Sequence, residues 1–181
     1  MYDVRRMYKG IKGRRSLRKS YIVTSYIVKV ASFDIVFQEI PGEVTLALNL
    51  SNCPCHCPGC HSQHLWEDIG EELNEALLDD LTERYKGLIT CVAFMGGDAD
   101  PEEVVRLASH VQGLKTAWYS GRPATPETSF NFQLSTFNFI KFGPYIEDLG
   151  GLKSEKTNQR LYKRVGNQWE DITSTFWKKS L

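Results

Sequence analysis

The chain has 181 residues, of which 41% are hydrophobic, and this suffices for one globular domain with a sizeable core. Its longest apolar runs fall far short of the ~20 residues that cross a bilayer, so we expect no membrane partner. The net charge of zero hides an asymmetry: residues 1–20 carry eight Lys and Arg against Asp3 alone, which makes +7, so residues 21–181 sum to −7. This acidic balance argues against a phosphate-binding surface on the domain, and hence against a nucleic-acid partner.

The basic residues 1–20 leave three interpretations open. They are a disordered extension, an arm for nucleic acid or an anionic surface, or the basic region of a signal peptide with its apolar core at residues 21–30. The last fits poorly, because polar and charged residues interrupt that core and no small-x-small cleavage site follows. We therefore expect a basic, disordered extension at 1–20 and a single domain at 21–181.

Apolar runs, the helical spacing of apolar residues and turn residues predict the elements of this domain. In chain order we expect strands at 32–37 and 44–50, a helix at 71–86, a strand at 88–95, a helix that begins at Asp100, strands at 115–119 and 138–142, and a terminal hairpin of 159–165 and 168–172. Residues 122–137 are left unassigned.

This order alternates strands with helices, which predicts an α/β fold with a mostly parallel sheet and right-handed crossovers. Ligands of such sheets gather at the carboxyl ends of the strands. Two motifs follow predicted strands: the cysteine loop, residues 51–61, and Gly96-Gly97-Asp98. We therefore expect both motifs at one edge of the sheet.

The cysteine loop holds four of the five cysteines, and Cys53, Cys57 and Cys60 follow the spacing C-x3-C-x2-C. Three thiolates on one short loop hold three irons of a 4Fe-4S cluster and leave the fourth iron without a protein ligand. An open iron is where a substrate binds and accepts an electron. Such crowded cysteines do not resemble a secreted disulfide framework, so we expect a cytoplasmic protein.

Two alternatives to a cluster remain open, namely a zinc site and free thiols. His56, His61 and His64 supply further zinc ligands, but no second pair of ligands follows downstream, as structural zinc sites usually require. Cys55 is surplus to the spacing, and we expect it to be a bystander that points away from the cluster. Cys91 lies in a strand run, where a free cysteine usually fills the core.

The cysteine spacing followed by Gly-Gly-Asp resembles the radical S-adenosylmethionine (SAM) enzymes. Three further stretches resemble, within that superfamily, the activating proteins of the anaerobic (class III) ribonucleoside-triphosphate reductase: Cys57–His61 with Trp66, 141–145 with 149–152, and 157–162. The resemblance covers about residues 32–175. Cys55 and residues 1–20 are not part of the family's pattern.

The resemblance implies a partial (β/α) barrel of the radical SAM type. It implies that Cys53, Cys57 and Cys60 bind a 4Fe-4S cluster and that Gly96, Gly97 and Asp98 lie against the amino group of SAM. Glycines allow backbone carbonyls to approach closely, and a carboxylate pairs with an ammonium group. We expect Tyr119, Ser120 and Gly121, at the end of the next strand, to line the nucleoside side.

The implied reaction is reductive cleavage of SAM to methionine and a 5′-deoxyadenosyl radical, which abstracts hydrogen from a glycine of the reductase's glycyl-radical subunit. The implied partners are this reductase and a one-electron donor such as flavodoxin or ferredoxin. No catalytic acid or base is needed, so we expect none. Two other functions stay open: activation of another glycyl-radical enzyme or attack on a small molecule, and a non-catalytic metal-binding module.

Overall fold

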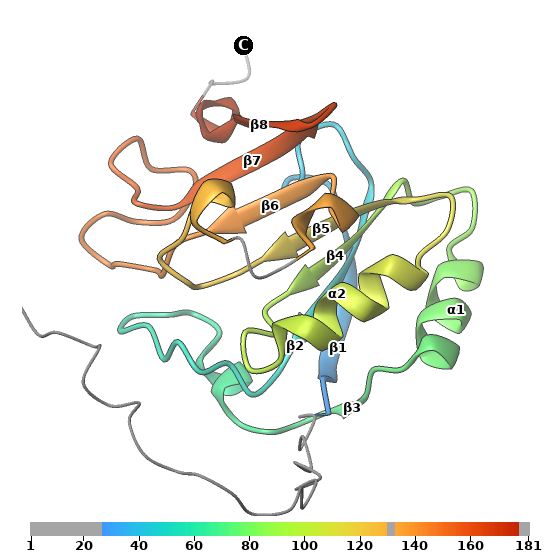
Figure 1. The fold of residues 1–181 in the computed structure, drawn as a ribbon. Coiled ribbons are helices and arrows are strands. Elements are labelled where there is room, and N and C mark those ends of the chain that lie inside the picture. The colour runs from blue at the N-terminus through green and yellow to red at the C-terminus, as the bar shows by residue number, and fades with distance from the viewer. Residues whose placement is uncertain (1–26, 130–132, 178–181) are drawn as a thin grey trace, which may run out of the picture.

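The computed structural model describes residues 27–129 and 133–177, so the expected extension at 1–20 lies outside the described residues. Figure 1 shows the elements in chain order. The strands are β1 (Lys29–Val36), β2 (Thr45–Leu50), β3 (Glu71–Glu72), β4 (Cys91–Met95), β5 (Lys115–Tyr119), β6 (Phe139–Phe142), β7 (Arg160–Val165) and β8 (Gln168–Asp171). The helices are α1 (Glu75–Arg84) and α2 (Pro101–His110), with short 3₁₀ turns at η2 (Gln63–Trp66), η3 (Pro126–Thr128), η4 (Leu134–Thr136) and η5 (Thr173–Phe176).

In the described part of the chain the strands form one eight-stranded sheet in the order β3-β1-β2-β4-β5-β6-β7-β8. The pairs β2–β4, β4–β5 and β5–β6 are parallel, whereas the four outer pairs are antiparallel. The sheet is therefore mixed, and the expectation of a mostly parallel sheet holds only for its middle. Residues 37–44 and 166–167 join β1 to β2 and β7 to β8, and both connections are too short for the crossover that parallel pairing needs. The connection from β6 to β7, residues 143–159, is longer.

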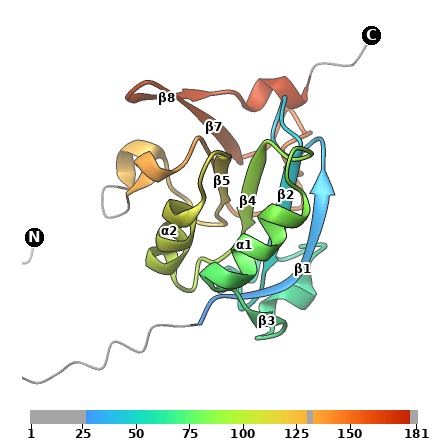
Figure 2. The ribbon, with the colours of Figure 1, turned by 90° about the vertical axis from the view of Figure 1, so that its right-hand side faces the viewer.

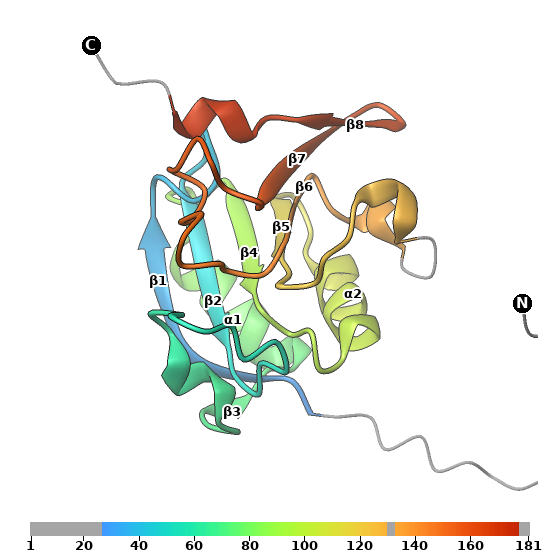
Figure 3. The ribbon, with the colours of Figure 1, turned by 90° about the vertical axis from the view of Figure 1, so that its left-hand side faces the viewer.

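Both helices lie on one face of the sheet, side by side, as Figure 2 shows. In β4, Val92 and Phe94 pack into the cluster of buried residues under these helices, while Cys91 and Ala93 belong to a second cluster on the opposite face. Leu152 and Phe176 pack against this second cluster. In Figure 3 the segment between β6 and β7 runs across that face. Burial on both faces explains why β4 reads as a continuous apolar run.

The helix boundaries follow from local chemistry. Asp100 accepts a hydrogen bond from the backbone N–H of Glu103 at 3.1 Å, and Pro101 opens α2, as the sequence predicts. The prediction of a helix from residue 71 is wrong, because Glu71 and Glu72 pair with β1 as β3. Asn74 instead caps α1, accepting from the N–H of Leu77. No helix in the described residues is long and apolar enough to cross a membrane.

Candidate functional site

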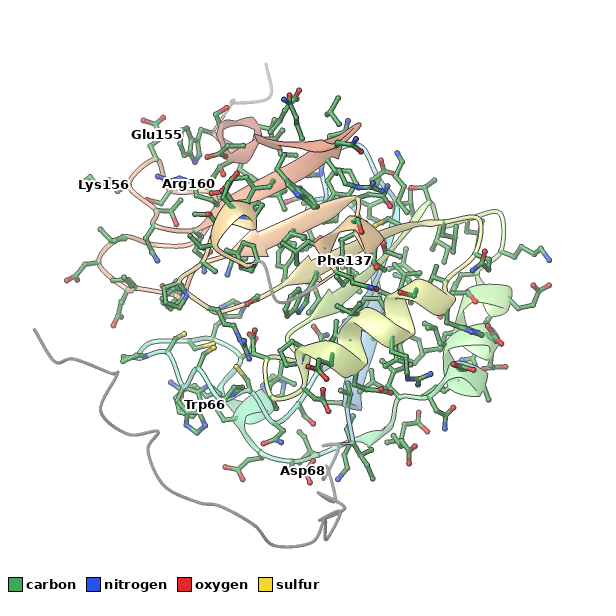
Figure 4. All side chains as sticks on the ribbon, in the orientation of Figure 1. Trp66, Asp68, Phe137, Glu155, Lys156 and Arg160 are labelled. Carbon is green, nitrogen blue, oxygen red and sulfur yellow. The ribbon has the colours of Figure 1, made fainter. Side chains whose placement is uncertain are left out.

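The carboxyl ends of the parallel strands β2, β4, β5 and β6 meet at one edge of the sheet, as expected. The cysteine loop follows β2, the Gly-Gly-Asp segment (Gly96–Asp98) follows β4, and Ser120 and Gly121 follow β5. In Figure 1 the cysteine loop lies beyond the arrowheads of these strands, and Figure 4 shows sulfur atoms along this loop. Residues about 70 positions apart therefore share one site.

Backbone hydrogen bonds join the start of the cysteine loop to the residues that follow it. The N–H of Asn52 donates to the carbonyl of Glu67 at 3.0 Å, and the N–H of Cys53 donates to that of Leu65 at 2.9 Å. Within the loop, the backbone of His56 is left-handed, with φ of 43°, and its ring stacks on Trp66 with the ring centroids 4.9 Å apart. The loop is thus a closed, anchored unit rather than a free connection.

The thiols of this loop are partly or fully enclosed. Cys57 is buried, while Cys53 and Cys60 are half-buried. A hydrogen bond from Cys55 lowers the pKa of the Cys53 thiol to about 6, and the same interaction raises the pKa of Cys55. Thiolates, rather than thiols, bind metal, so this environment favours ligation by Cys53.

The residues fit a 4Fe-4S cluster by the chemistry of the donor set. Three thiols lie on one anchored loop at the spacing C-x3-C-x2-C, which suits three irons of such a cluster. Across residues 27–129 and 133–177, no three His, Cys, Asp or Glu side chains are already gathered around a single point. We therefore expect the thiols to close around the cluster as it binds. His61 and His64 are exposed.

The Gly-Gly-Asp segment is shaped by packing against β2 and α2. Gly97 has φ of +82°, and a Cβ there would lie 2.4 Å from Val104 Cγ2, so the chain tolerates only glycine at this position. The carbonyl of Gly96 accepts a hydrogen bond from Trp118 Nε1 at 2.8 Å. The backbone of this segment is therefore held rigidly between β4 and β5.

Asp98 joins this segment to the residues after β5. Its side chain is buried, with 2% of the residue exposed. One carboxylate oxygen accepts from Ser120 Oγ at 2.6 Å, and the other accepts from the N–H of Gly121 at 2.8 Å. The Arg122 guanidinium lies 3.3 Å from the same carboxylate. The structure thus brings Asp98, Ser120 and Gly121 into direct contact, with an ionic partner that sequence reasoning missed.

Cys55 is directed at the Gly-Gly-Asp segment, and our expectation that it points away from the cluster stays a prediction. Its Sγ lies 3.7 Å from Asp98 Oδ2, and a Cβ on Gly121 would be only 2.7 Å from the same sulfur. The physical reason is that the loop folds back onto the ends of β4 and β5, where glycine leaves space for a thiol. Cys91 is fully buried in the core, as predicted.

Lys141 is a second charged group that sequence reasoning missed as part of the site. It comes from β6, is 8% exposed, and its Nζ donates to the carbonyl of Gly143 at 2.7 Å and approaches that of Ser120 at 3.5 Å. Burial lowers its pKa to about 8, while the negative charge of Asp98 opposes this shift. A lysine in an otherwise apolar strand is the sequence signal that could have identified it.

Hydrogen bonds between its own polar groups hold the segment between β6 and β7 together, and this segment reaches the cysteine loop. Asn158 Nδ2 donates to the carbonyl of Pro144 at 2.9 Å, and Thr157 Oγ1 donates to that of Gly150 at 3.1 Å. A Cβ on Gly59 would lie 3.0 Å from a carboxylate oxygen of Glu147. A cavity of about 260 Å³ lies between Pro58 and residues 145–148.

Comparison with known families agrees with this site. Residues 41–121 match the family model described as a 4Fe-4S single cluster domain. The matched segment runs from the turn before β2 to Gly121, so it contains the cysteine loop, the Gly-Gly-Asp segment and Ser120. The match supports an iron–sulfur cluster and metal binding, and it disfavours the zinc alternative. Neither the curated proteins nor the solved structures gave a match.

Proposed function

We propose that this chain is a radical SAM enzyme that activates the anaerobic ribonucleoside-triphosphate reductase by placing a glycyl radical on it. The observation that carries the proposal is the junction of the cysteine loop with the Gly-Gly-Asp segment at one edge of the sheet, where Cys55 Sγ lies 3.7 Å from Asp98 Oδ2. For the fold, we propose that β2, β4, β5 and β6 with their two helices are the partial barrel of that superfamily.

In this proposal Cys53, Cys57 and Cys60 would hold a 4Fe-4S cluster, which would supply the one-electron reduction that cleavage of SAM requires. The cluster carries the redox chemistry, while the chain binds, orients and excludes water. The carbonyl of Gly96 accepts a hydrogen bond from Trp118 Nε1, which fixes the backbone of the segment that would bind the amino group of SAM. Preorganised dipoles of this kind stabilise a bound charge without reorganisation.

Asp98 acts mainly through the residues it holds. Its two oxygens fix Ser120 and Gly121 at the nucleoside side of the proposed site, and Arg122 balances its charge. The buried Lys141 adds positive charge behind Ser120, and the thiols of Cys53 and Cys57 interact favourably with it.

The proposed partner rests on the stretches that resemble the reductase activators. Residues 141–145, 149–152 and 157–162 follow one another closely in the sequence. Hydrogen bonds such as that from Gln159 Nε2 to the carbonyl of Gly143, at 3.4 Å, join them into one unit beside the cysteine loop. A surface beside the reactive centre is where a partner's glycine must arrive. This arrangement supports the reductase over an unrelated target.

The test is anaerobic reconstitution with iron and sulfide, followed by reduction in the presence of SAM and the anaerobic reductase. We expect an electron paramagnetic resonance signal of a glycyl radical on the reductase. SAM cleavage without that radical would refute the partner and leave another glycyl-radical enzyme or a small molecule as the target. A loaded cluster whose signal does not change with SAM would indicate a non-catalytic metal-binding module.

A further inference from the structure

Cys55 lies where the cysteine loop touches the rest of the site, although no feature of the C-x3-C-x2-C spacing requires a cysteine there. Its thiol contacts the Asp98 carboxylate, at 3.7 Å from Oδ2, and lies against the backbone of Gly121. These two residues end the segments that follow β4 and β5. Cys55 is therefore the side chain through which the loop rests on both segments.

Gly121 fits this sulfur by its lack of a side chain. A Cβ there would be 2.7 Å from Cys55 Sγ and 3.1 Å from Cys55 Cβ, distances that real Cβ atoms essentially never show or only rarely tolerate. Gly121 is not among the glycines with positive φ, so its backbone alone does not require glycine. The requirement comes from the thiol, and the two residues form a complementary pair.

The surface that receives the thiol is rigid. Asp98 is 2% exposed and is held by Ser120 Oγ at 2.6 Å and by the Gly121 N–H at 2.8 Å. On the opposite side of the loop, His56 stacks on Trp66. The stack on Trp66 and the contact of Cys55 with Asp98 therefore both hold the loop, and the contact at Cys55 joins it to the Gly-Gly-Asp segment.

We propose that Cys55 is a positioning residue for SAM, which rests on the proposed function. Its thiol fixes the separation between the cluster ligands of the cysteine loop and the Gly-Gly-Asp segment, so that one SAM molecule reaches the open iron and that segment together. Cys55 itself is not a cluster ligand. Small displacements between two groups that hold one substrate weaken binding strongly.

The experiment compares Cys55→Ala, Cys55→Ser, Gly121→Ala and the double variant Cys55→Ala/Gly121→Ala, each anaerobically loaded with iron and sulfide. Iron per chain, and the SAM concentration that half-converts the spin-resonance signal of the reduced cluster, are measured. Cys91→Ala and Gly151→Ala are matched controls, because Cys91 lies in the core and a Cβ on Gly151 meets only Gln159 Oε1, at 3.8 Å.

We expect Cys55→Ala and Gly121→Ala to keep wild-type iron content and to weaken SAM binding roughly tenfold each, the effect of about 1.4 kcal/mol. Cys55→Ser, which keeps a donor for Asp98, should bind SAM nearly as the wild type does. The double variant should be no worse than Cys55→Ala, because the added methyl group then occupies the space of the missing sulfur. The controls should bind SAM normally.

Three results would overturn this role. Iron lost in Cys55→Ala as in Cys57→Ala would make Cys55 a cluster ligand. Unchanged SAM binding in Cys55→Ala and Gly121→Ala would show that the contact between these residues only fills space. Strictly additive losses of SAM affinity in the double variant would show that the two residues act independently. Failure of the proposed function looks different: the wild-type protein itself, fully loaded with iron, would show no response to SAM.

Discussion

Replacing Asp98 by alanine perturbs the best-connected polar group of the site. The change leaves the hydroxyl of Ser120, which is fully buried, and the N–H of Gly121 without their acceptor. Each buried donor left unsatisfied costs about 1–3 kcal/mol. The pair with Arg122 adds less than about 1 kcal/mol, since 38% of the Arg122 side chain is exposed.

The expected loss in the free energy of unfolding is therefore about 3–5 kcal/mol for Asp98→Ala, which in a chain of this size lowers the melting temperature by roughly 10 °C. Asp98→Asn keeps one acceptor oxygen and should lose about half as much. Urea unfolding of the iron-free protein measures this, with the exposed Asp148→Ala as control.

A loss below about 1 kcal/mol in Asp98→Ala would refute the reasoning, because it would mean that Ser120 and Gly121 find other partners. Loaded with iron, Asp98→Ala should retain its cluster, since Asp98 is not a ligand, and should bind SAM more weakly. If Asp98→Ala lost iron as well as free energy of unfolding, the Gly-Gly-Asp segment would also support the cysteine loop.

Alanine at any one of the three proposed cluster ligands should abolish a stable four-iron cluster, whereas Cys55→Ala should keep it. The iron content per chain measures this. A cluster that survives in Cys57→Ala but not in Cys55→Ala would reverse the assignment. Removal of residues 1–20 should leave iron content and SAM cleavage unchanged, and a loss of either would give that segment a function. Because the pKa of Lys141 is about 8 in the folded chain and 10.5 in the unfolded chain, the unfolded state binds more protons between these values, so stability should rise as pH increases through this window. Urea unfolding at several pH values measures this rise in the free energy of unfolding, and Lys141→Met should flatten it. A rise in Lys141→Met equal to that of the wild type would contradict the reasoning, as would a flattened rise in the exposed control Lys153→Met.

The sequence predicts well where the signal is local. Strand 115–119 matches β5, and the cap at Asp100 with Pro101 begins α2 as expected. The terminal hairpin also forms, with Val165 paired to Gln168 around the Gly166 turn. In each case, neighbouring residues alone decide the backbone conformation.

Prediction fails where distant contacts decide. Glu71 and Glu72 have helical neighbours, but pairing with β1, some 40 residues earlier, draws them into a strand. The direction of Cys55 depends on the space at Gly121, which no local pattern reveals. The ionic partner of Asp98 is Arg122, whose position is set by the parallel pairing of β4 and β5. The site's composition was thus predictable, but its contacts were not.

The central claim is that this chain cleaves SAM at its cluster, and product formation tests it most directly. The wild-type protein, loaded with four irons and reduced without oxygen, should convert SAM to 5′-deoxyadenosine and methionine in equal amounts, while Cys57→Ala treated identically should form neither. A fully loaded wild-type protein that yields no 5′-deoxyadenosine would contradict the account.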